Sequence, residues 1–320
     1  MKKLIFSLLA ASLFLAVPAI AAEKFPSRPI EIISNGSPGS GMSLFSQAVA
    51  KTLSDILKTP VNVVHKSAGN GAQAVEYLKS KPADGYTLIT WSSGMAMFMH
   101  FKHFRATPED LYFLCDLQRS LYSLVVPAES PFKTIQDLID YAKQNPGKLE
   151  IGSAKVGAPQ HVHVMNFAGA AGIEINYVPY AGTGETMKDV LGGHLRVGLV
   201  QPFLALPHVA AGKVRILLNT SENRLPELPD VPVPADLGLN YPFYHQGFGL
   251  ALRSGTPPER IAILTKALKE VSENAEFKAY ANQSVGMISV WRNNEEYAED
   301  FQRNYKTAAE LIKKYNLDAN

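Results

Sequence analysis

Three times along this chain, a short apolar strand pattern runs into a loop of glycine and small residues, and a helical pattern follows. The first strand covers residues 29–33, and its loop, SNGSPGSGMS, covers residues 34–43. Residues 148–161 and 175–185 repeat the same order of strand, loop and helix start. Strand patterns that alternate with helical patterns predict an α/β fold with mainly parallel sheets.

The first 21 residues have the composition of a leader. Two lysines precede an apolar run over residues 4–17, and small residues follow up to position 21. This order predicts a cleavable signal peptide over residues 1–21. An uncleaved anchor is the alternative, but about fourteen apolar residues are few for a membrane span. The single cysteine, Cys115, lies far from the leader and has no partner for an internal disulfide. We therefore expect a soluble periplasmic protein without a lipid anchor.

Charge and length narrow the function further. Removing the leader takes away two of the 31 basic residues and none of the 29 acidic ones, which leaves a formal charge of zero. Nucleic-acid binding needs a concentrated basic surface, so we expect no nucleic-acid partner. About 300 mature residues exceed what one hydrophobic core usually organises, which predicts two lobes.

The glycine loops have a chemistry of their own. In open α/β sheets, ligands bind at the carboxyl ends of the strands. A helix that begins there presents unpaired N–H groups and a partial positive charge, which favour an anion. A single loop of this kind is as well explained as a connector, and Ser43 as the N-cap of the first helix. Three such loops favour a shared anion site.

Competing motifs are incomplete. The loop at 34–43 lacks the lysine of a P-loop, and its glycines do not have the spacing of a dinucleotide site. His161 and His163 are two residues apart, so on a helix they point to nearly opposite faces. His100 and His103 have no carboxylate or cysteine nearby to complete a metal site. No serine lies in a nucleophile elbow. We predict no catalytic residue, no metal and no cofactor.

Seven segments, taken together and in order, resemble one known family. They are FPSRPIEII (25–33), DGYTL (84–88), NPGKLEIGSA (145–154), VPYAGTGETMKDVLGGHL (178–195), LPHVAAGKVRIL (206–217), LPDVPVPADLGL (228–239) and GTPPERIAILTKALKEV (255–271). The family is that of the substrate-binding proteins of tripartite tricarboxylate transporters, the Bug-type periplasmic receptors.

The resemblance implies a two-lobed α/β binding protein of type II, a Venus-flytrap whose cleft closes on a small carboxylate. Residues 22–122 are then the first part of lobe 1, and residues 123–246 are lobe 2. Residues 247–320 return to lobe 1 and add the C-terminal helices. The receptor is expected to be a monomer that delivers its ligand to membrane permease subunits.

The resemblance also implies the binding site. The family's cleft is lined by the first strand–helix loop and by two loops of the second lobe, which match residues 35–43, 152–161 and 179–184. With the end of the third strand and one further glutamine, the predicted ligand-binding residues are Ser37, Gly39, Ser40, Gly41, Met42, Ser43, Trp91, Ser92, Ser93, Ser153, Lys155, Gly157, Ala158, Gln160, His161, Tyr180, Gly182, Thr183, Gly184 and Gln201.

Departures from the family pattern bear on the ligand. The family's aspartate at the first helix start is absent, because Met42 and Ser43 end that loop. Lys155 stands where the family has a glycine, and it either faces the cleft or extends into solvent. Trp91 and the following Met95, Met97, Phe98 and Met99 either line the cleft or pack in the core. If some of them face the cleft, the pocket suits a carboxylate with an apolar or aromatic body better than citrate.

The predicted function is therefore periplasmic capture of a small carboxylate for a tripartite tricarboxylate-type transporter, without catalysis. Two alternatives stay open. The chain is a receptor that presents its ligand to a membrane sensor kinase, or it is a periplasmic enzyme that acts on a small acid.

Overall fold

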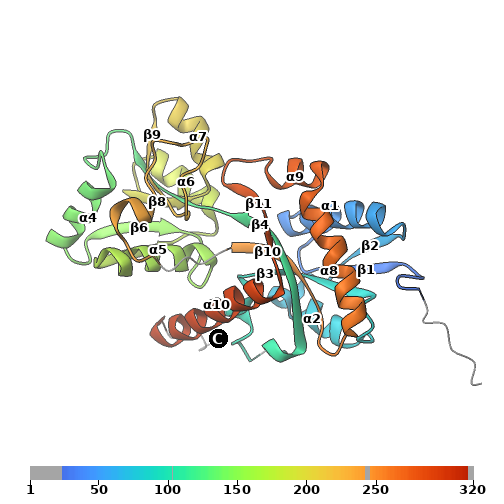
Figure 1. Cartoon of the computed structure of the whole chain (residues 1–320). Helices are drawn as coiled ribbons and strands as arrows, with labels where there is room; N and C mark the ends of the chain where they lie inside the picture. Colours follow the sequence, from blue (N-terminus) through green and yellow to red (C-terminus); the bar gives the residue numbers. More distant parts are fainter. Residues whose placement is uncertain (1–23, 103, 242–245, 316–320) are drawn as a thin grey trace, which may run out of the picture.

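The computed structural model describes residues 24–102, 104–241 and 246–315, which form two lobes that each contain one sheet (Figure 1). The two-lobed α/β class predicted from the sequence is confirmed. The predicted signal peptide, residues 1–21, lies outside the described residues.

The sheet of the first lobe has the strand order β11-β4-β10-β3-β1-β2. Its strands are β1 (Ile30–Ser34), β2 (Val61–His65), β3 (Thr87–Ser92), β4 (Leu111–Ser120), β10 (Gln246–Arg253) and β11 (Met287–Arg292). The sheet of the second lobe has the order β7-β6-β8-β5-β9. Its strands are β5 (Ser123–Pro127), β6 (Leu149–Ser153), β7 (Ile175–Pro179), β8 (Val197–Val200) and β9 (Val214–Asn219).

The prediction of mainly parallel sheets is wrong, because each lobe receives a strand from the other. In the described residues, β1 pairs in parallel with β2 and β3, and β6 pairs in parallel with β7 and β8. The chain enters the second sheet through β5, which lies antiparallel between β8 and β9. It returns to the first sheet through β10, which lies antiparallel between β3 and β4. Strand β11 adds a further antiparallel pair at the edge.

Helices cover both faces of both sheets. The α-helices are α1 (Gly41–Leu57), α2 (Ala72–Lys79), α3 (Met95–Phe98), α4 (Ile135–Gln144), α5 (Pro159–Ala171), α6 (Thr183–Leu191), α7 (Pro202–Ala210), α8 (Pro258–Glu273), α9 (Ala275–Ala281) and α10 (Asn294–Tyr315). Three short 3-10 turns are η1 (Ala68–Gly71), η2 (Pro108–Asp110) and η3 (Pro234–Leu237). Helix α1 packs against α8 and α9, whereas α10 packs against α3 and β4.

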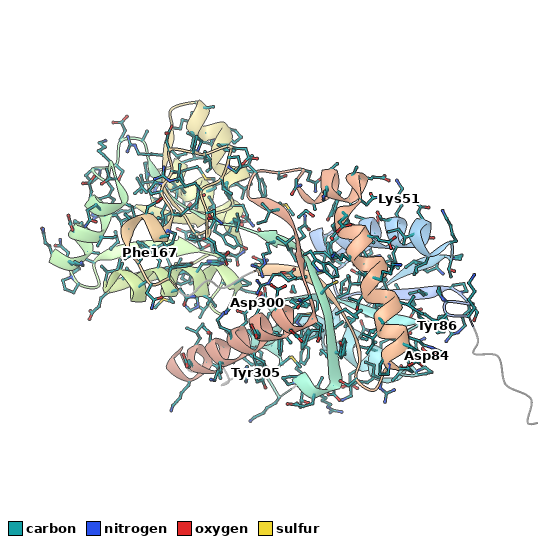
Figure 2. All side chains as sticks on the ribbon, viewed as in Figure 1. Lys51, Asp84, Tyr86, Phe167, Asp300 and Tyr305 are labelled. Carbon is teal, nitrogen blue, oxygen red and sulfur yellow. The ribbon has the colours of Figure 1, made fainter. Side chains whose placement is uncertain are left out.

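Each lobe has its own core on both faces of its sheet. In the first lobe, Phe45, Val49 and Leu53 recur at helical spacing along α1 and are all fully buried with the apolar side chains of β1 and β3. In the second lobe, Phe167 of α5 is buried with the strands β5, β6 and β8 (Figure 2). The two main cores are separate, and a small apolar cluster of Met97, Val162 and three side chains of α10 joins the lobes.

Two segments join the lobes. The chain passes from β4 to β5 through Leu121 and the fully buried Tyr122, and it returns between β9 and β10. On β10, a Cβ at Gly249 would lie 2.1 Å from the carbonyl oxygen of Cys115, so only glycine fits against β4. The change of sheet falls between Ser120 and Ser123 and again between Asn219 and Gln246. The lobe boundaries at 122/123 and 246/247 stay a prediction.

Candidate functional site

A hollow of about 450 Å³ opens at the carboxyl ends of β1 and β3, in the first lobe. It is lined by Asn35, Gly36, Ser37, Ser40, Met42, Ser67, Asn70, Ser92, Met95, Phe98 and Phe248. None of these side chains is charged. Hydroxyl and amide groups lie beside two thioethers and two aromatic rings, so this first-lobe hollow offers hydrogen bonds together with an apolar wall.

The start of α1 forms one side of the first-lobe hollow. The hydroxyl of Ser40 accepts a hydrogen bond from the backbone N–H of Ser43 at 3.3 Å, and Ser40 is therefore the N-cap of α1. The interpretation of Ser43 as the N-cap is wrong, because Ser43 is fully buried in the first helical turn. The first turn contains no acidic side chain. Its positive end is therefore not neutralised by its own sequence.

A further glycine-bearing loop, residues 67–73 between β2 and α2, contributes to the same hollow. Asn70 has the left-handed backbone conformation, with φ at 53°, between Gly69 and Gly71, which also have positive φ. A non-glycine residue in this region is uncommon and is often found at functional positions. The buried Oδ1 atom of Asn35 has no hydrogen-bond partner within the described part of the chain. The hollow therefore also offers an acceptor to a ligand.

The loop between β6 and α5 stands at the facing edge of the second lobe. The hydroxyl of Ser153 donates to the carbonyl of Leu199 at 2.6 Å and is fully buried. The N–H of Gly157 donates to Nδ1 of the buried His161 at 3.2 Å. The N-cap of α5, Ala158, makes no side-chain hydrogen bond to the first turn. Ser153 and His161 thus shape the loop, and the N–H groups at the start of α5 stay uncapped by a side chain.

The loop between β7 and α6 is joined to the end of β8. The hydroxyl of Thr183 donates to Oε1 of Gln201 at 2.7 Å, which links two predicted site residues. The phenol of Tyr180 donates to Asp189 at 2.8 Å. Burial and the nearby Asp189 carboxylate raise the pKa of Tyr180 to about 12. Tyr180 is therefore neutral at physiological pH and acts as a hydrogen-bond donor.

The two lobes touch where the loops meet. A Cβ on Gly94, just before α3, would lie 3.3 Å from the ring of Pro159 at the start of α5. The amide of Gln160 donates to the phenol of Tyr122 in the crossing segment at 3.0 Å. Farther along the same helices, Met97 and Val162 share an apolar cluster with α10. These contacts bring the predicted loops of the second lobe towards the hollow of the first.

The predicted residues separate into distinct groups in space. Four of them line the first-lobe hollow: Ser37, Ser40, Met42 and Ser92. Gly39 and Gly41 are exposed on its loop, whereas the hydroxyl of Ser93 accepts from the N–H of Gly247 at 3.1 Å. The predicted residues of the second lobe do not line this hollow: Ser153, Lys155, Gly157, Ala158, Gln160, His161, Tyr180, Gly182, Thr183, Gly184 and Gln201.

Trp91 was predicted as a ligand residue and instead packs in the core. Its side chain is fully buried, with ring centroids 5.7 Å from Phe113 and 5.9 Å from Phe301. Strand alternation explains the outcome, since Ser92, the next residue of β3, points to the hollow. Of the cluster that follows, Met95 and Phe98 line the hollow, whereas Met97 and Met99 are buried.

Seven lining residues are not among the predicted ligand-binding residues. Asn35 and Gly36 fall in the predicted loop 35–43, and Met95 and Phe98 belong to the cluster that the sequence left open between cleft and core. Sequence reasoning therefore missed only three of them: Ser67, Asn70 and Phe248. The glycine loop at residues 67–73 carried a signal for two of them, because its composition matches that of the first loop. Phe248 carried no such signal, since it lies on the strand that returns from the second lobe.

The described residues contain neither a metal-binding cluster nor a helix that could cross a membrane. No group of three or more His, Cys, Asp or Glu side chains is arranged to hold a metal ion in the described ranges. Within those same ranges, every helix is too short or too polar to span a bilayer.

Sequence comparison places the chain in a family. Residues 45–317 match the family described as "Tripartite tricarboxylate transporter family receptor". The "UPF0065 protein in gbd 5'region" of Cupriavidus necator is 32% identical over 304 residues, which cover 94% of this chain and 92% of the relative. Protein BugT of Bordetella pertussis is 28% identical over 280 residues, covering 85% and 86%. The chain belongs to the tripartite tricarboxylate transporter receptor family, a family of periplasmic binding proteins, and the resemblance to Bug-type receptors is confirmed.

Solved structures share the fold. A TctC solute-binding protein from Polaromonas, solved with no ligand, has a TM-score of 0.81 at 24% identity and covers 91% of this chain and 99% of its own. Rpa4515 of R. palustris, solved with adipate, has a TM-score of 0.69 at 22% identity, with 90% and 97% covered. MatC of Rhodopseudomonas palustris, with bound malate, has a TM-score of 0.65 at 19% identity, with 90% and 100% covered.

Proposed function

We propose that this protein captures a small carboxylate with an apolar body in the periplasm and delivers it to the membrane subunits of a tripartite tricarboxylate-type transporter. The observation that carries the proposal is the first-lobe hollow, where uncharged hydrogen-bonding groups and the α1 N-terminus lie beside Met42, Met95, Phe98 and Phe248. Adipate and malate in two structural neighbours support a carboxylate.

The hollow favours a carboxylate for a physical reason. The N–H groups at the start of α1 and the Ser37 and Ser40 hydroxyls supply hydrogen bonds and partial positive charge to one end of the ligand. The sulfur atoms and rings on the other wall exclude water from its hydrocarbon part. Citrate, with three carboxylates, would place charge against that apolar wall. An aliphatic or aromatic acid would not.

The proposed receptor role also includes export to the periplasm, a monomeric state and closure of the two lobes over the ligand. The leader, residues 1–21, directs export. The receptor works as a monomer and has no catalytic role. The loops around residues 152–161 and 179–184 close over the bound carboxylate, and Lys155 contributes a cation from that side. The lobe division at 122/123 and 246/247 places the closing motion at the two crossing segments.

A thermal-denaturation screen tests the ligand class. The panel holds aliphatic dicarboxylates, hydroxy acids, aromatic acids, amino acids, nicotinic-type acids, sugars and metal cations. A true ligand at a hundred times its Kd stabilises the fold by about 2.7 kcal/mol. We expect that stabilisation from a carboxylate in wild type and its loss in Ser67→Phe, which places a ring in the first-lobe hollow. A shift caused only by sugars or cations would overturn the carboxylate assignment.

The same acids test for catalysis. Purified protein is incubated with each acid that shifts the melting temperature, and the mass of the acid is followed. We expect the acid to be recovered unchanged. A new product that forms in proportion to the protein would show an enzyme and overturn the receptor proposal.

A further inference from the structure

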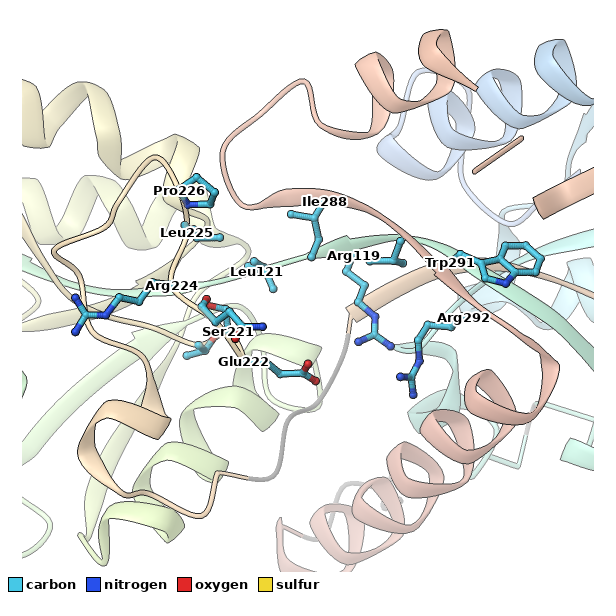
Figure 3. A pocket seen from close by; sticks show the side chains of 13 residues that line it. Arg119, Leu121, Ser221, Glu222, Arg224, Leu225, Pro226, Ile288, Trp291 and Arg292 are labelled. Atoms are coloured by element: carbon cyan, nitrogen blue, oxygen red, sulfur yellow. The ribbon is translucent and has the colours of Figure 1, made fainter. Parts of the chain in front are cut away.

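A second cavity, of about 470 Å³, lies where the two lobes meet (Figure 3). Three segments line it: Arg119 and Leu121 at the crossing from β4, residues 220–226 after β9, and the strand β11. Strands β4 and β11 belong to the sheet of the first lobe, and residues 220–226 follow β9 of the second lobe. We call this space the hinge cavity.

The hinge cavity lies apart from the first-lobe hollow. The two share no lining residue. In the sheet order, β3, β10 and β4 separate β1, which leads into the hollow, from β11, which lines the hinge cavity. Four steps of about 4.8 Å put these two strands roughly 19 Å apart. The two spaces come closest at β10 and β4, where Phe248 borders the hollow and Arg119, on the neighbouring strand, borders the hinge cavity.

Cations dominate the charged lining of the hinge cavity. Arg119, Arg224 and Arg292 line it, together with the single carboxylate of Glu222. Figure 3 shows the side chains of Arg119 and Arg292 pointing the same way from β4 and β11, and Glu222 reaching towards them from the other lobe. Guanidinium groups are the common partners of carboxylate, sulfonate and phosphate oxygens.

Neighbouring acids hold all three of these guanidinium groups, and Arg224 pairs with Asp236 at 3.0 Å. Asp300 accepts from Nη2 of Arg119 and, at 3.1 Å, from Nη2 of Arg292. Asp116 accepts from Nε of Arg119 at 3.0 Å, and Glu296 lies 3.4 Å from Nη1 of Arg292. The Nε–H of Arg292 is buried and has no acceptor among the described residues. A buried charged donor without an acceptor is unfavourable, and a bound anion would supply one.

The rest of the lining is apolar enough to hold a hydrocarbon group. Leu121, Leu225, Pro226, Ile288 and Val290 border the cavity from both lobes. A plain inorganic anion would leave these side chains against water. We propose that the hinge cavity is a second ligand site, which takes an organic monoanion with a hydrocarbon body and binds its charged end at Arg292.

Trp291 provides a signal from the edge of the cavity, since it lies on β11 between the lining residues Val290 and Arg292 and is one of two tryptophans. Its ring points away from Arg119 and Arg292 and packs on the first-lobe core (Figure 3). The other, Trp91, is fully buried in the first-lobe core and gives a constant background. Cyclohexanecarboxylate, which does not absorb where tryptophan is excited, is titrated into the full protein while tryptophan emission is followed. We expect a saturable change with this anion and none with the neutral cyclohexanecarboxamide.

Matched variants locate the binding. Arg292→Gln removes a guanidinium that both lines the cavity and pairs with Asp300, whereas Arg303→Gln removes one that pairs with Asp300 but does not line the cavity. We expect Arg292→Gln to raise the Kd about tenfold, the effect of one charge-assisted hydrogen bond. Arg303→Gln should leave it within about twofold. Asn223→Phe, which fills the cavity from an exposed position on the other lobe, should abolish the response.

One further variant separates this site from the proposed carboxylate site. Ser67→Phe obstructs the first-lobe hollow and should leave the Trp291 titration unchanged. Loss of the response in Ser67→Phe with retention in Arg292→Gln would place the anion in the first-lobe hollow and overturn the second site. No saturable change in wild type, or an equal change with the neutral amide, would also overturn it.

Discussion

At the scale of single residues, Lys155 allows a direct test of how the carboxylate is bound. It is exposed in the loop between β6 and α5 and makes no ion pair within the described part of the chain. Its loop neighbours Ala154, Val156 and Gly157 bring no carboxylate. If its ammonium meets the ligand, one charge-assisted hydrogen bond is worth roughly 1.5–3 kcal/mol. Lys155→Ala should then weaken carboxylate binding about 10- to 100-fold by calorimetry.

Lys148→Ala is the matched control for this prediction. Lys148 is also exposed, but it lies before β6, at the opposite end of that strand from the loop. Its removal changes the net charge equally and should leave the affinity unchanged. Added salt should narrow the difference between wild type and Lys155→Ala, because exposed charges are screened. Equal affinities of wild type and Lys155→Ala would make the lysine a surface residue and leave capture to the backbone amides.

Asp116 makes the stability of the first lobe depend on pH. Its carboxyl is buried on β4, and burial raises its pKa from 3.8 to about 6 despite the nearby Arg119. Because the folded-state pKa lies above the unfolded-state pKa, the folded protein binds more protons between pH 4 and pH 6. The contribution of Asp116 to stability is thus present below pH 4 and is lost as the pH rises through 6. At about 1.4 kcal/mol per pKa unit, the loss is roughly 3 kcal/mol.

Urea unfolding of wild type and Asp116→Asn across pH 4 to 7 measures this effect. The variant lacks the titrating group, so the free energy of unfolding of wild type minus that of the variant should fall as the pH rises. Other carboxyl groups titrate in both proteins and cancel in the difference. A difference that stays flat across this window would show that Arg119 keeps Asp116 ionised throughout.

The residues of the first-lobe hollow show which parts of the site could be predicted from the sequence. The loop composition predicts an anion site at the start of α1. Ser37, Ser40, Met42 and Ser92 line the hollow there, and their role in binding stays a prediction. Trp91 and Ser92 are consecutive on β3, and strand alternation puts only Ser92 at the hollow, whereas Trp91 is buried in the core. Which serine caps α1 depends on the turn at residues 37–40, where the N–H of Ser40 donates to the carbonyl of Ser37. Composition alone does not determine that turn.

Among the elements, α4 of the second lobe shows a helix start that the sequence specifies locally. The hydroxyl of Thr134 accepts from the N–H of Asp137, and the carboxylate of Asp137 accepts from the N–H of Thr134. These hydrogen bonds form a capping box and lower the pKa of Asp137. Thr134→Ala removes one of them without disturbing the core, because Thr134 is exposed. The expected loss is about 1 kcal/mol of unfolding free energy.

Thr134→Ser serves as the control, since its hydroxyl is able to make the same hydrogen bond. Denaturant unfolding should show Thr134→Ser close to wild type and Thr134→Ala less stable, with equal slopes for all three proteins. If alanine and serine are equally stable, the cap contributes nothing measurable and α4 is held by packing of Leu138 and Ile139 alone.

The positions of strands with a clear apolar pattern could be predicted from the sequence, but the way in which the strands pair in the sheets could not. The strand predicted at residues 29–33 agrees with β1 to within about a residue. Strand β11 gave no such signal in a segment predicted to be largely helical. The antiparallel insertion of β10 depends on contacts between residues more than a hundred positions apart, and that of β5 on contacts about 70 to 100 positions apart. Short-range periodicity carries no information on either.

At the scale of the whole molecule, the exchange of β5 and β10 determines how the lobes are connected. In each sheet, the first strand after a crossing lies between two other strands: β5 in the second lobe and β10 in the first. Both crossings therefore lie inside the sheets and not at their edges. The first-lobe hollow lies on one side of these crossings and the hinge cavity on the other. A rotation about the crossings that narrows one space would widen the other.

Closure of the lobes is the prediction that belongs to this scale. Two separate cores joined by two crossing segments allow a hinge motion, and a carboxylate held by loops of both lobes would favour the closed form. Small-angle X-ray scattering should show a smaller radius of gyration at saturation with the tightest acid from the thermal screen. Ser67→Phe with the same acid should show no change. An unchanged wild-type curve, with saturation verified by calorimetry on the same sample, would mean that the ligand binds without closing the lobes.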